Sequence, residues 1–159
     1  MSLLEPLWAG LATGGFAALF NLRGKDLPLA AVGGALGWVV YAPVQASLGS
    51  QAIGCLAASA LIGFWAEIVA VFRKRPASVY IACGIIPLVP GGGMYYTMLE
   101  YVRGHNWNGM ATGLATLLAA GAIAVGLAVS SLVSRLLMLR SLARRISSPT
   151  RKIPSPRRK

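Results

Sequence analysis

Two prolines and three consecutive glycines stand together in residues 85–96, Ile-Ile-Pro-Leu-Val-Pro-Gly-Gly-Gly-Met-Tyr-Tyr, within an apolar run from about 77 to 101. Proline removes a backbone donor and clashes with the preceding helical turn, and glycine tolerates positive φ. The pattern predicts a broken membrane helix. Because bare backbone cannot face hydrocarbon, the break must be buried in protein or line a wet cavity. Such breaks form substrate sites in transporters; the alternative is a simple proline kink or buried turn.

The residues after the break predict a half-helix from Met94 to about Val102. Its N-terminus would present free N–H groups and a partial positive charge, which suit the carboxylate of an amino acid. Tyr95, Tyr96 and Thr97 would supply hydroxyl groups beside it. The glycine run matches no Walker or dinucleotide pattern, so it does not indicate a nucleotide site. The candidate substrate residues of this segment are Pro87, Pro90, Gly91, Gly92, Gly93, Tyr95 and Tyr96.

Glu67 is the one charged residue expected inside the third apolar run, from about 52 to 72. It shares a helical face with Ser59 and Gly63 by i, i+4 spacing, which favours burial in protein over contact with lipid. An intramembrane carboxylate is a functional hypothesis by default. Because removal from water favours its neutral form, Glu67 could carry a proton or handle substrate. The alternative is an ion pair with basic residues 73–75, since the helix end is only about 8 Å away.

The composition is that of an integral membrane protein. Of 159 residues, 56% are hydrophobic and 12% are charged, whereas soluble domains carry about 25% charged residues. Several apolar runs approach the ~20 residues that cross a bilayer. We therefore expect an all-α, polytopic helix bundle of about five transmembrane helices, the fourth of them broken at the proline and glycine motif.

The basic residues indicate how the chain crosses the membrane. With five crossings and the N-terminus outside, Arg23, Lys25, residues 73–75 and the basic C-terminal segment are cytoplasmic, and only Arg103 is outside. This split of fourteen to one fits the enrichment of Lys and Arg in cytoplasmic loops. Four crossings would instead place residues 73–75 opposite the C-terminal segment or require a re-entrant loop.

We place the helix bundle in residues 1–139 and a basic cytoplasmic tail in residues 140–159, disordered beyond about residue 146. Membrane lipid is the expected partner of the tail, although a topology anchor explains it equally well. The net charge of +11 does not indicate nucleic-acid binding, because no aromatic residue is interleaved with the tail to stack on bases.

The other reactive side chains indicate no enzyme, no metal site and no cofactor. Cys55 and Cys83 lie within apolar runs, where we expect them to pack as small side chains. His105 is a lone loop histidine without a cluster of metal ligands. Nothing resembles a nucleophile with its base, or a pair of intramembrane acids. Apart from Glu67, the acidic residues lie near predicted helix ends: Glu5, Asp26 and Glu100.

Residues 84–96, Gly-Ile-Ile-Pro-Leu-Val-Pro-Gly-Gly-Gly-Met-Tyr-Tyr, resemble a motif of the threonine/serine exporter family, in its small-subunit or carboxy-terminal half (the ThrE and YjjB-like proteins). Residues 15–21, Gly-Phe-Ala-Ala-Leu-Phe-Asn, look like the end of the family's first helix. Residues 61–67, Leu-Ile-Gly-Phe-Trp-Ala-Glu, followed by Arg75-Pro76, also fit. The resemblance covers roughly residues 10 to 130, and its proline-glycine motif is the most specific part.

The resemblance implies a proton-driven exporter of threonine and serine in the bacterial inner membrane. Some split members of the family are associated with succinate export instead. Family members either fuse this half to a larger one or use two chains, so the resemblance implies a separate large subunit for this chain. The basic tail lies outside the motif region and inherits no family function.

Two classes of function remain open from the residues. In the first, the chain is a transporter subunit whose broken helix helps to form the substrate site, with Glu67 as proton carrier or structural partner and Asn21 as a weaker polar candidate. In the second, it is a non-transporting assembly subunit whose glycine-rich faces bind the large subunit. The identity of the solute and any higher oligomer also stay open.

Overall fold

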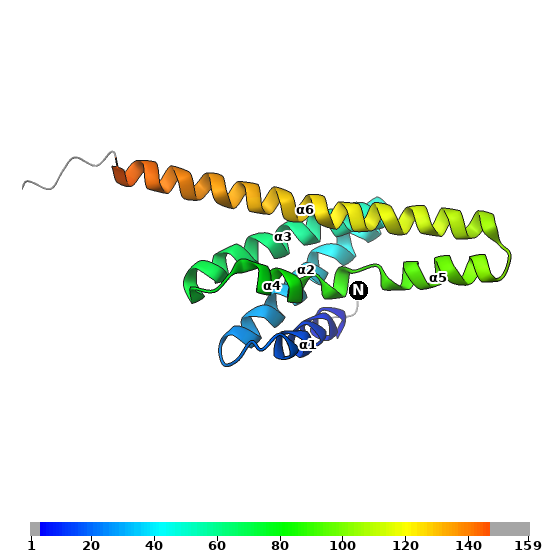
Figure 1. Ribbon diagram of the computed structural model, residues 1–159, viewed down its shortest axis with the longest axis horizontal. Coiled ribbons are helices and arrows are strands. Elements are labelled where there is room, and N and C mark those ends of the chain that lie inside the picture. The colour runs from blue at the N-terminus through cyan, green and yellow to red at the C-terminus, as the bar shows by residue number, and fades with distance from the viewer. Residues whose placement is uncertain (1–3, 147–159) are drawn as a thin grey trace, which may run out of the picture.

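The computed structural model describes residues 4–146, with side chains up to residue 136, and in this range the chain forms helices joined by turns and no strands (Figure 1). The expected all-α fold is therefore confirmed. The helices are α1 (Leu4–Leu19), α2 (Asp26–Leu48), α3 (Gln51–Arg73), α4 (Ala77–Gly84), the 3-10 helix η1 (Ile86–Leu88), α5 (Gly91–Val102) and α6 (Asn106–Ile146).

Three helices are long and apolar enough to cross a membrane, namely α2, α3 and Asn106–Leu136 of α6. The bent pair of Ala77–Leu88 and Gly91–Val102 makes a fourth if it forms one span. At 16 residues, α1 is shorter than the ~20 residues that cross a bilayer. The protein is thus a multi-pass helix bundle, and helix lengths in the described part of the chain do not establish the expected five crossings.

Small residues hold α1 tightly against α2. Gly10 and Gly14 of α1 face the backbone and short side chains of α2, and a methyl group added at Gly34 of α2 would overlap Thr13 of α1. Thr13 is fully buried, and its hydroxyl donates a 2.9 Å hydrogen bond to the carbonyl of Ala9. The small-residue face of α1 therefore serves close helix packing.

The helices α3 and α6 lie side by side and run in the same direction (Figure 1). A methyl group at Gly126 of α6 would meet Ser59 of α3, and one at Gly63 of α3 would meet Ser130 of α6. The residue numbers of the paired positions increase in the same direction along both helices, so the helices are parallel. The C-terminal end of α6 consequently lies on the same side of the bundle as Arg73, the last residue of α3.

The fourth apolar run is broken where the prolines and glycines predict. The helix α4 ends at Gly84, η1 carries the chain past Pro87, and α5 begins at Gly91 with a bend of 48° between the two halves. The second half begins three residues before the expected Met94, because Pro90 can precede a first turn that three glycines still permit. The structure thus confirms the break and moves the start of the second half-helix from the expected Met94 to Gly91.

The hairpin of α5 and the first part of α6 extends away from the other helices (Figure 1). Gly93, Thr97 and Tyr101 of α5 approach residues 109–116 of α6, whereas α3 packs near residues 126–130. No residue of α5 is buried. With its 41 residues, α6 measures roughly 60 Å, about twice the thickness of a hydrocarbon core. Part of α6 therefore lies outside that core or is steeply tilted.

Two apolar clusters form the core of the bundle. One packs Ala66 and Val69 of α3 against Tyr80 and Cys83 of α4. The second surrounds Ile62 and Cys55 of α3 together with Leu88 of η1 and two residues of α6. Both cysteines are free and buried, in agreement with the expectation that they pack as small side chains.

The expected boundary between bundle and tail, at residues 139 and 140, falls inside α6, which continues to Ile146. The rest of the basic tail, residues 147–159, lies outside the described part of the chain.

Candidate functional site

The backbone of the break is hydrogen-bonded within its own turns. The amide of Leu88 donates to the carbonyl of Ile85 at 2.8 Å, that of Gly91 to Val89 at 2.7 Å, and that of Met94 to Pro90 at 3.2 Å. Leu88 is 4% exposed, and η1 packs against both α1 and α2. The η1 part of the break is therefore held within the bundle, whereas Val89, Gly91 and Gly92 are exposed.

Pro87, the first proline of the break, shares a cavity with a carboxylate. It lines a cavity of about 200 Å³ together with Glu5 and Trp8 of α1 and Trp38 of α2. The indole Nε1 of Trp38 donates a 3.3 Å hydrogen bond to Oε2 of Glu5. The functional groups that share this cavity with Pro87 are therefore one carboxylate and two indole rings.

A wider groove of about 550 Å³ continues from the same Glu5 and Trp38 along α2. Its wall includes Tyr41 and Gln45, and it extends to Gly49, the residue that follows α2. The rings of Trp38 and Tyr41 lie 5.1 Å apart between centroids at an angle of 45°. The groove therefore combines a carboxylate, two adjacent aromatic rings and a side-chain amide.

This groove reaches the middle of α2 along its length. Trp38 lies twelve residues after the start of α2 and ten before its end, which is about 18 Å and 15 Å from the two ends. Glu5 contacts Trp38, so its carboxylate is near the middle of a helix that is long enough to span the membrane. The groove runs from that depth to one end of α2.

Sequence reasoning missed Glu5 because it lies in the first turn of an apolar run and looks like an interfacial residue. Its depth follows from the pairing of α1 with α2, in which the short α1 begins opposite Trp38 rather than opposite the end of α2. The length of the run gave no signal of this depth, because about eighteen residues measure roughly 27 Å, close to the ~30 Å of a hydrocarbon core.

The structure does not bring Glu67 to the break. Glu67 is partly buried on α3, one turn beyond Gly63 and therefore on the side of α3 that faces α6. Leu88 of η1 packs instead with Cys55 and Ile62, one to three turns farther from the Arg73 end of α3. The suggested role of Glu67 in proton or substrate handling stays a prediction.

Asn21 lies at the opposite end of α1 from Glu5. It is exposed, has a φ of 61°, and its amide donates to the carbonyl of Ala18 at 3.0 Å. Asparagine tolerates this left-handed conformation at the end of a helix. The geometry therefore gives Asn21 a helix-ending role and does not place it beside the break.

The predicted hydroxyl groups of α5 also lie apart from the cavity at Pro87. Tyr95 and Tyr96 are exposed and contact each other edge to face, with ring centroids 5.4 Å apart. The Thr97 hydroxyl donates to the carbonyl of Gly93 within its own helix at 2.6 Å. Gly91 and Gly92 face open space. Pro90 is buried, and Gly93 packs against Thr116 of α6. Of the candidate residues in this segment, only Pro87 therefore lies at the cavity.

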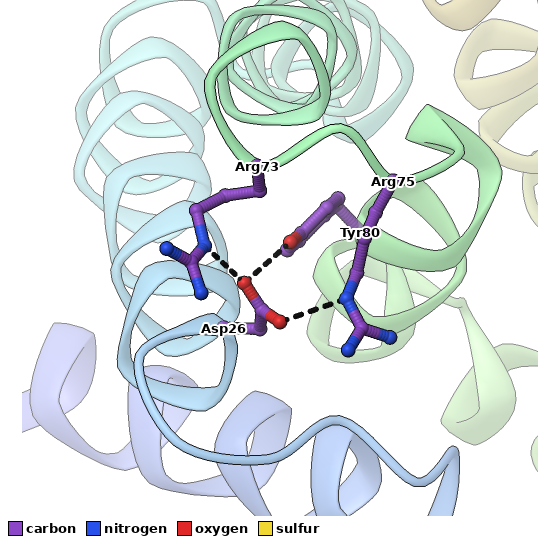
Figure 2. A network of polar contacts seen from close by, with 4 residues as sticks. All are labelled: Asp26, Arg73, Arg75 and Tyr80. Atoms are coloured by element: carbon purple, nitrogen blue, oxygen red, sulfur yellow. Dashed lines mark hydrogen bonds and ion pairs between the residues drawn. The ribbon is translucent and has the colours of Figure 1, made fainter.

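A second polar cluster, which we call the Asp26 cluster, consists of Asp26, Arg73, Arg75 and Tyr80 (Figure 2). Asp26 is 1% exposed. Its Oδ2 lies 2.9 Å from Nε of Arg75, and its Oδ1 accepts hydrogen bonds from Nε of Arg73 and from the Tyr80 hydroxyl, the latter at 3.0 Å. The buried charge is therefore compensated by two cations and one neutral donor.

The Asp26 cluster ties the first residue of α2 to the turn between α3 and α4 (Figure 2). A carboxylate that is removed from water needs such pairing, because its desolvation is costly. Sequence analysis treated Asp26 as a turn residue and residues 73–75 only as a topology signal. Asp26 and Arg73 are 47 positions apart in the sequence. Local sequence patterns therefore could not predict their contact.

Other acidic and metal-ligating side chains form no larger site. Glu100, in the last turn of α5, pairs at 2.9 Å with His105 of the turn that follows. Within the described part of the chain, no three His, Cys, Asp or Glu side chains gather as metal ligands would. The cavity at Pro87, with its adjoining groove, and the Asp26 cluster thus carry polar side chains into the described part of the bundle.

Comparison with known proteins gives one match. A family model described as threonine/serine exporter, ThrE, matches residues 5–133. Neither a curated protein nor a solved structure matches the chain significantly. The matched residues begin at Glu5 and include the break, the groove and the Asp26 cluster.

Proposed function

Because the chain belongs to the threonine/serine exporter family, we propose that it is one subunit of a proton-driven exporter of these amino acids that acts with a separate large subunit. The family is one of transporters, and the apolar helices make the chain a multi-pass membrane protein. Proton coupling and the second subunit are the parts that this proposal adds.

The observation that carries the proposal is the meeting of the broken helix with a polar groove at mid-depth. Pro87 and Glu5 line the same cavity, and the groove from Glu5 leads to the end of α2. Irregular backbone and an ionisable group at membrane depth are both costly in lipid, so their combination indicates a solute path.

The hairpin of α5 and α6 supports a protein partner. Its outward-facing side chains include Met94, Tyr95, Met98 and Trp107, all more than half exposed. Such a surface needs cover by lipid or by protein, and methionines and aromatic residues are typical of interface cores. We assign this surface to the large subunit. A higher oligomer would use the same surface.

We further propose that the chain lies in a bacterial inner membrane with its C-terminus in the cytoplasm. The split of fourteen basic residues to one favours this orientation. It places the Asp26 cluster at the cytoplasmic end of the bundle and the open end of the groove at the outer side, where an exported solute leaves.

Efflux measurements test this function. Cells that express the chain with and without a candidate large subunit are loaded with labelled threonine or labelled succinate. We expect threonine efflux only with both chains, and its collapse on addition of an uncoupler. Succinate efflux alone would change the substrate, and a stable complex without efflux of either solute would favour the assembly role.

A further inference from the structure

We propose that Arg73 and Arg75 bind the phosphate group of an anionic phospholipid, and that Asp26 holds their guanidinium groups in place for it. The site lies at the end of the bundle where α2 begins and α3 ends. Both helices are long and apolar enough to cross a membrane, so this end lies at the level of the lipid headgroups. The inference does not depend on which solute is exported.

This end of the bundle carries a large excess of positive charge. The connections from α1 to α2 and from α3 to α4, together with the adjoining helix ends, hold five cationic side chains and one carboxylate: Arg23, Lys25, Arg73, Lys74, Arg75 and Asp26. Arg23, Lys25 and Lys74 are exposed. The excess of four positive charges attracts anionic lipid to this end, as basic residues beside membrane helices do.

The Asp26 cluster adds a specific geometry to this general attraction. Arg73 and Arg75 each contact the carboxylate through Nε (Figure 2), and a guanidinium has further N–H donors on its two Nη atoms. The two arginines also keep one positive charge between them after Asp26 is paired. Their side chains are 34% and 50% exposed, whereas that of Asp26 is 2% exposed. A ligand can therefore reach the guanidinium groups but not the carboxylate that orients them.

The turn that carries both arginines is fixed by its own backbone. The amides of Lys74 and Arg75 both donate to the carbonyl of Ala70, that of Arg75 at 3.2 Å, and Lys74 has a left-handed φ of 53°. Pro76 follows and restricts the backbone of Arg75. The two guanidinium groups are therefore held in position before a ligand arrives, which lowers the entropy cost of binding.

Phosphate is the group at headgroup depth that suits this pair of arginines. A planar guanidinium forms paired hydrogen bonds with phosphate oxygens, which a lysine cannot do. Zwitterionic lipids carry a cation beside their phosphate, and the positive charge of this end repels that cation. The site therefore favours a lipid of net negative charge, such as phosphatidylglycerol. Inorganic phosphate offers the same oxygens without acyl chains and is the alternative source of the group.

Thermal unfolding of the full chain in a neutral detergent tests the site. The chain is titrated with dioctanoyl phosphatidylglycerol, dioctanoyl phosphatidylcholine or inorganic phosphate. We expect phosphatidylglycerol to raise Tm by several degrees, because a ligand of the folded state stabilises it, and the other two to leave Tm nearly unchanged. An equal shift with inorganic phosphate would overturn the lipid as ligand, and an equal shift with phosphatidylcholine would overturn the requirement for negative charge.

Two variants separate the paired arginines from the general attraction. The double variant Arg73→Lys, Arg75→Lys keeps both charges and loses both planar groups, so we expect its half-maximal shift at roughly tenfold higher phosphatidylglycerol. Arg23→Lys is the matched control, because it makes the same change at the same end but outside the Asp26 cluster, and it should respond like the unaltered chain. Equal responses of the double variant and the control would overturn the site. All variants keep the basic C-terminal segment, so its attraction to lipid cancels in the comparison.

A second variant and readout keep the test decisive if the double variant does not fold. Arg75→Lys changes only the more exposed of the two arginines, and we expect a rise of roughly threefold in the half-maximal lipid concentration. Native mass spectrometry counts the bound lipid without reference to stability. Arg75→Lys should retain less phosphatidylglycerol than Arg23→Lys, and equal retention by these two variants would overturn the site.

Discussion

Nε of Arg75 lies 2.9 Å from Oδ2 of Asp26, which joins the turn before α4 to the first residue of α2. Arg73 and Tyr80 hold the other carboxylate oxygen. Three helices therefore meet at one buried charge at the end of the bundle that we assign to the cytoplasm. Any movement of α4, and with it of the break, has to preserve or replace these contacts.

Asp26→Asn should lower the melting temperature of the detergent-solubilised protein by several degrees. The amide keeps the size of the carboxylate but loses the charge that two guanidinium groups now share, so charge-assisted hydrogen bonds become weaker ones. Thermal unfolding followed by tryptophan fluorescence measures the change. Glu100→Gln removes a more exposed acid and should melt close to the unaltered chain. Equal melting of both variants would contradict the structural role of Asp26.

Tyr80→Phe should destabilise the protein by about 0.5–1.5 kcal/mol, because it removes one buried hydrogen bond and leaves the ring in place. The hydroxyl donates to Asp26 at 3.0 Å. In the background of Asp26→Asn the same change should cost less, since the acceptor is then a neutral amide. A double-mutant cycle measures the coupling. Fully additive effects would indicate that the hydroxyl does not act through Asp26.

Gly34→Ala should destabilise the contact between α1 and α2 by about 1–3 kcal/mol, the usual cost of overpacking. Its methyl group would overlap the buried Thr13 side chain. Gly15→Ala is the control within the same pair of helices, because a methyl group there meets nothing within 4 Å. That control should be neutral or slightly stabilising in a helix. Denaturant titration of both variants tests the difference.

Glu67→Gln should abolish coupled export while assembly with the large subunit survives. Its amide cannot exchange a proton, and the partly buried position on α3 is not part of either apolar cluster. Efflux of labelled threonine at several external pH values, together with co-purification of the two chains, gives both readouts. Normal export by this variant at every pH would exclude a proton role for Glu67.

Gly92→Leu should stop threonine efflux with the complex intact. A Cβ atom added at Gly92 meets nothing within 4 Å in the chain itself, so loss of flux would reflect obstruction at the break rather than misfolding. Gly93→Leu is the contrasting variant, since it would strike Thr116 and disturb the packing of α5 on α6. Loss of the large subunit from the Gly92 variant on co-purification would instead support the assembly role.

The amino-acid sequence by itself determined the class of the protein and the place of its break. Apolar runs of membrane length specify helices, because only a helix satisfies its own backbone in lipid. The bend between α4 and α5 follows from Pro87, Pro90 and the glycines, which act on their own backbone. The family motif lies in this same segment, so the resemblance was also available from local sequence.

Only the tertiary structure decided which polar groups meet. Glu5 approaches Pro87, and Asp26 approaches Arg73 and Arg75, through the registers in which α1, α2 and α3 pack. Those registers depend on close contacts such as Thr13 with Gly34, and many residues in these helices are small enough to permit alternatives. Periodicity identifies the buried face of a helix but not its height against a neighbour. The sequence therefore pointed to Glu67, and the packing brought Glu5 to the break.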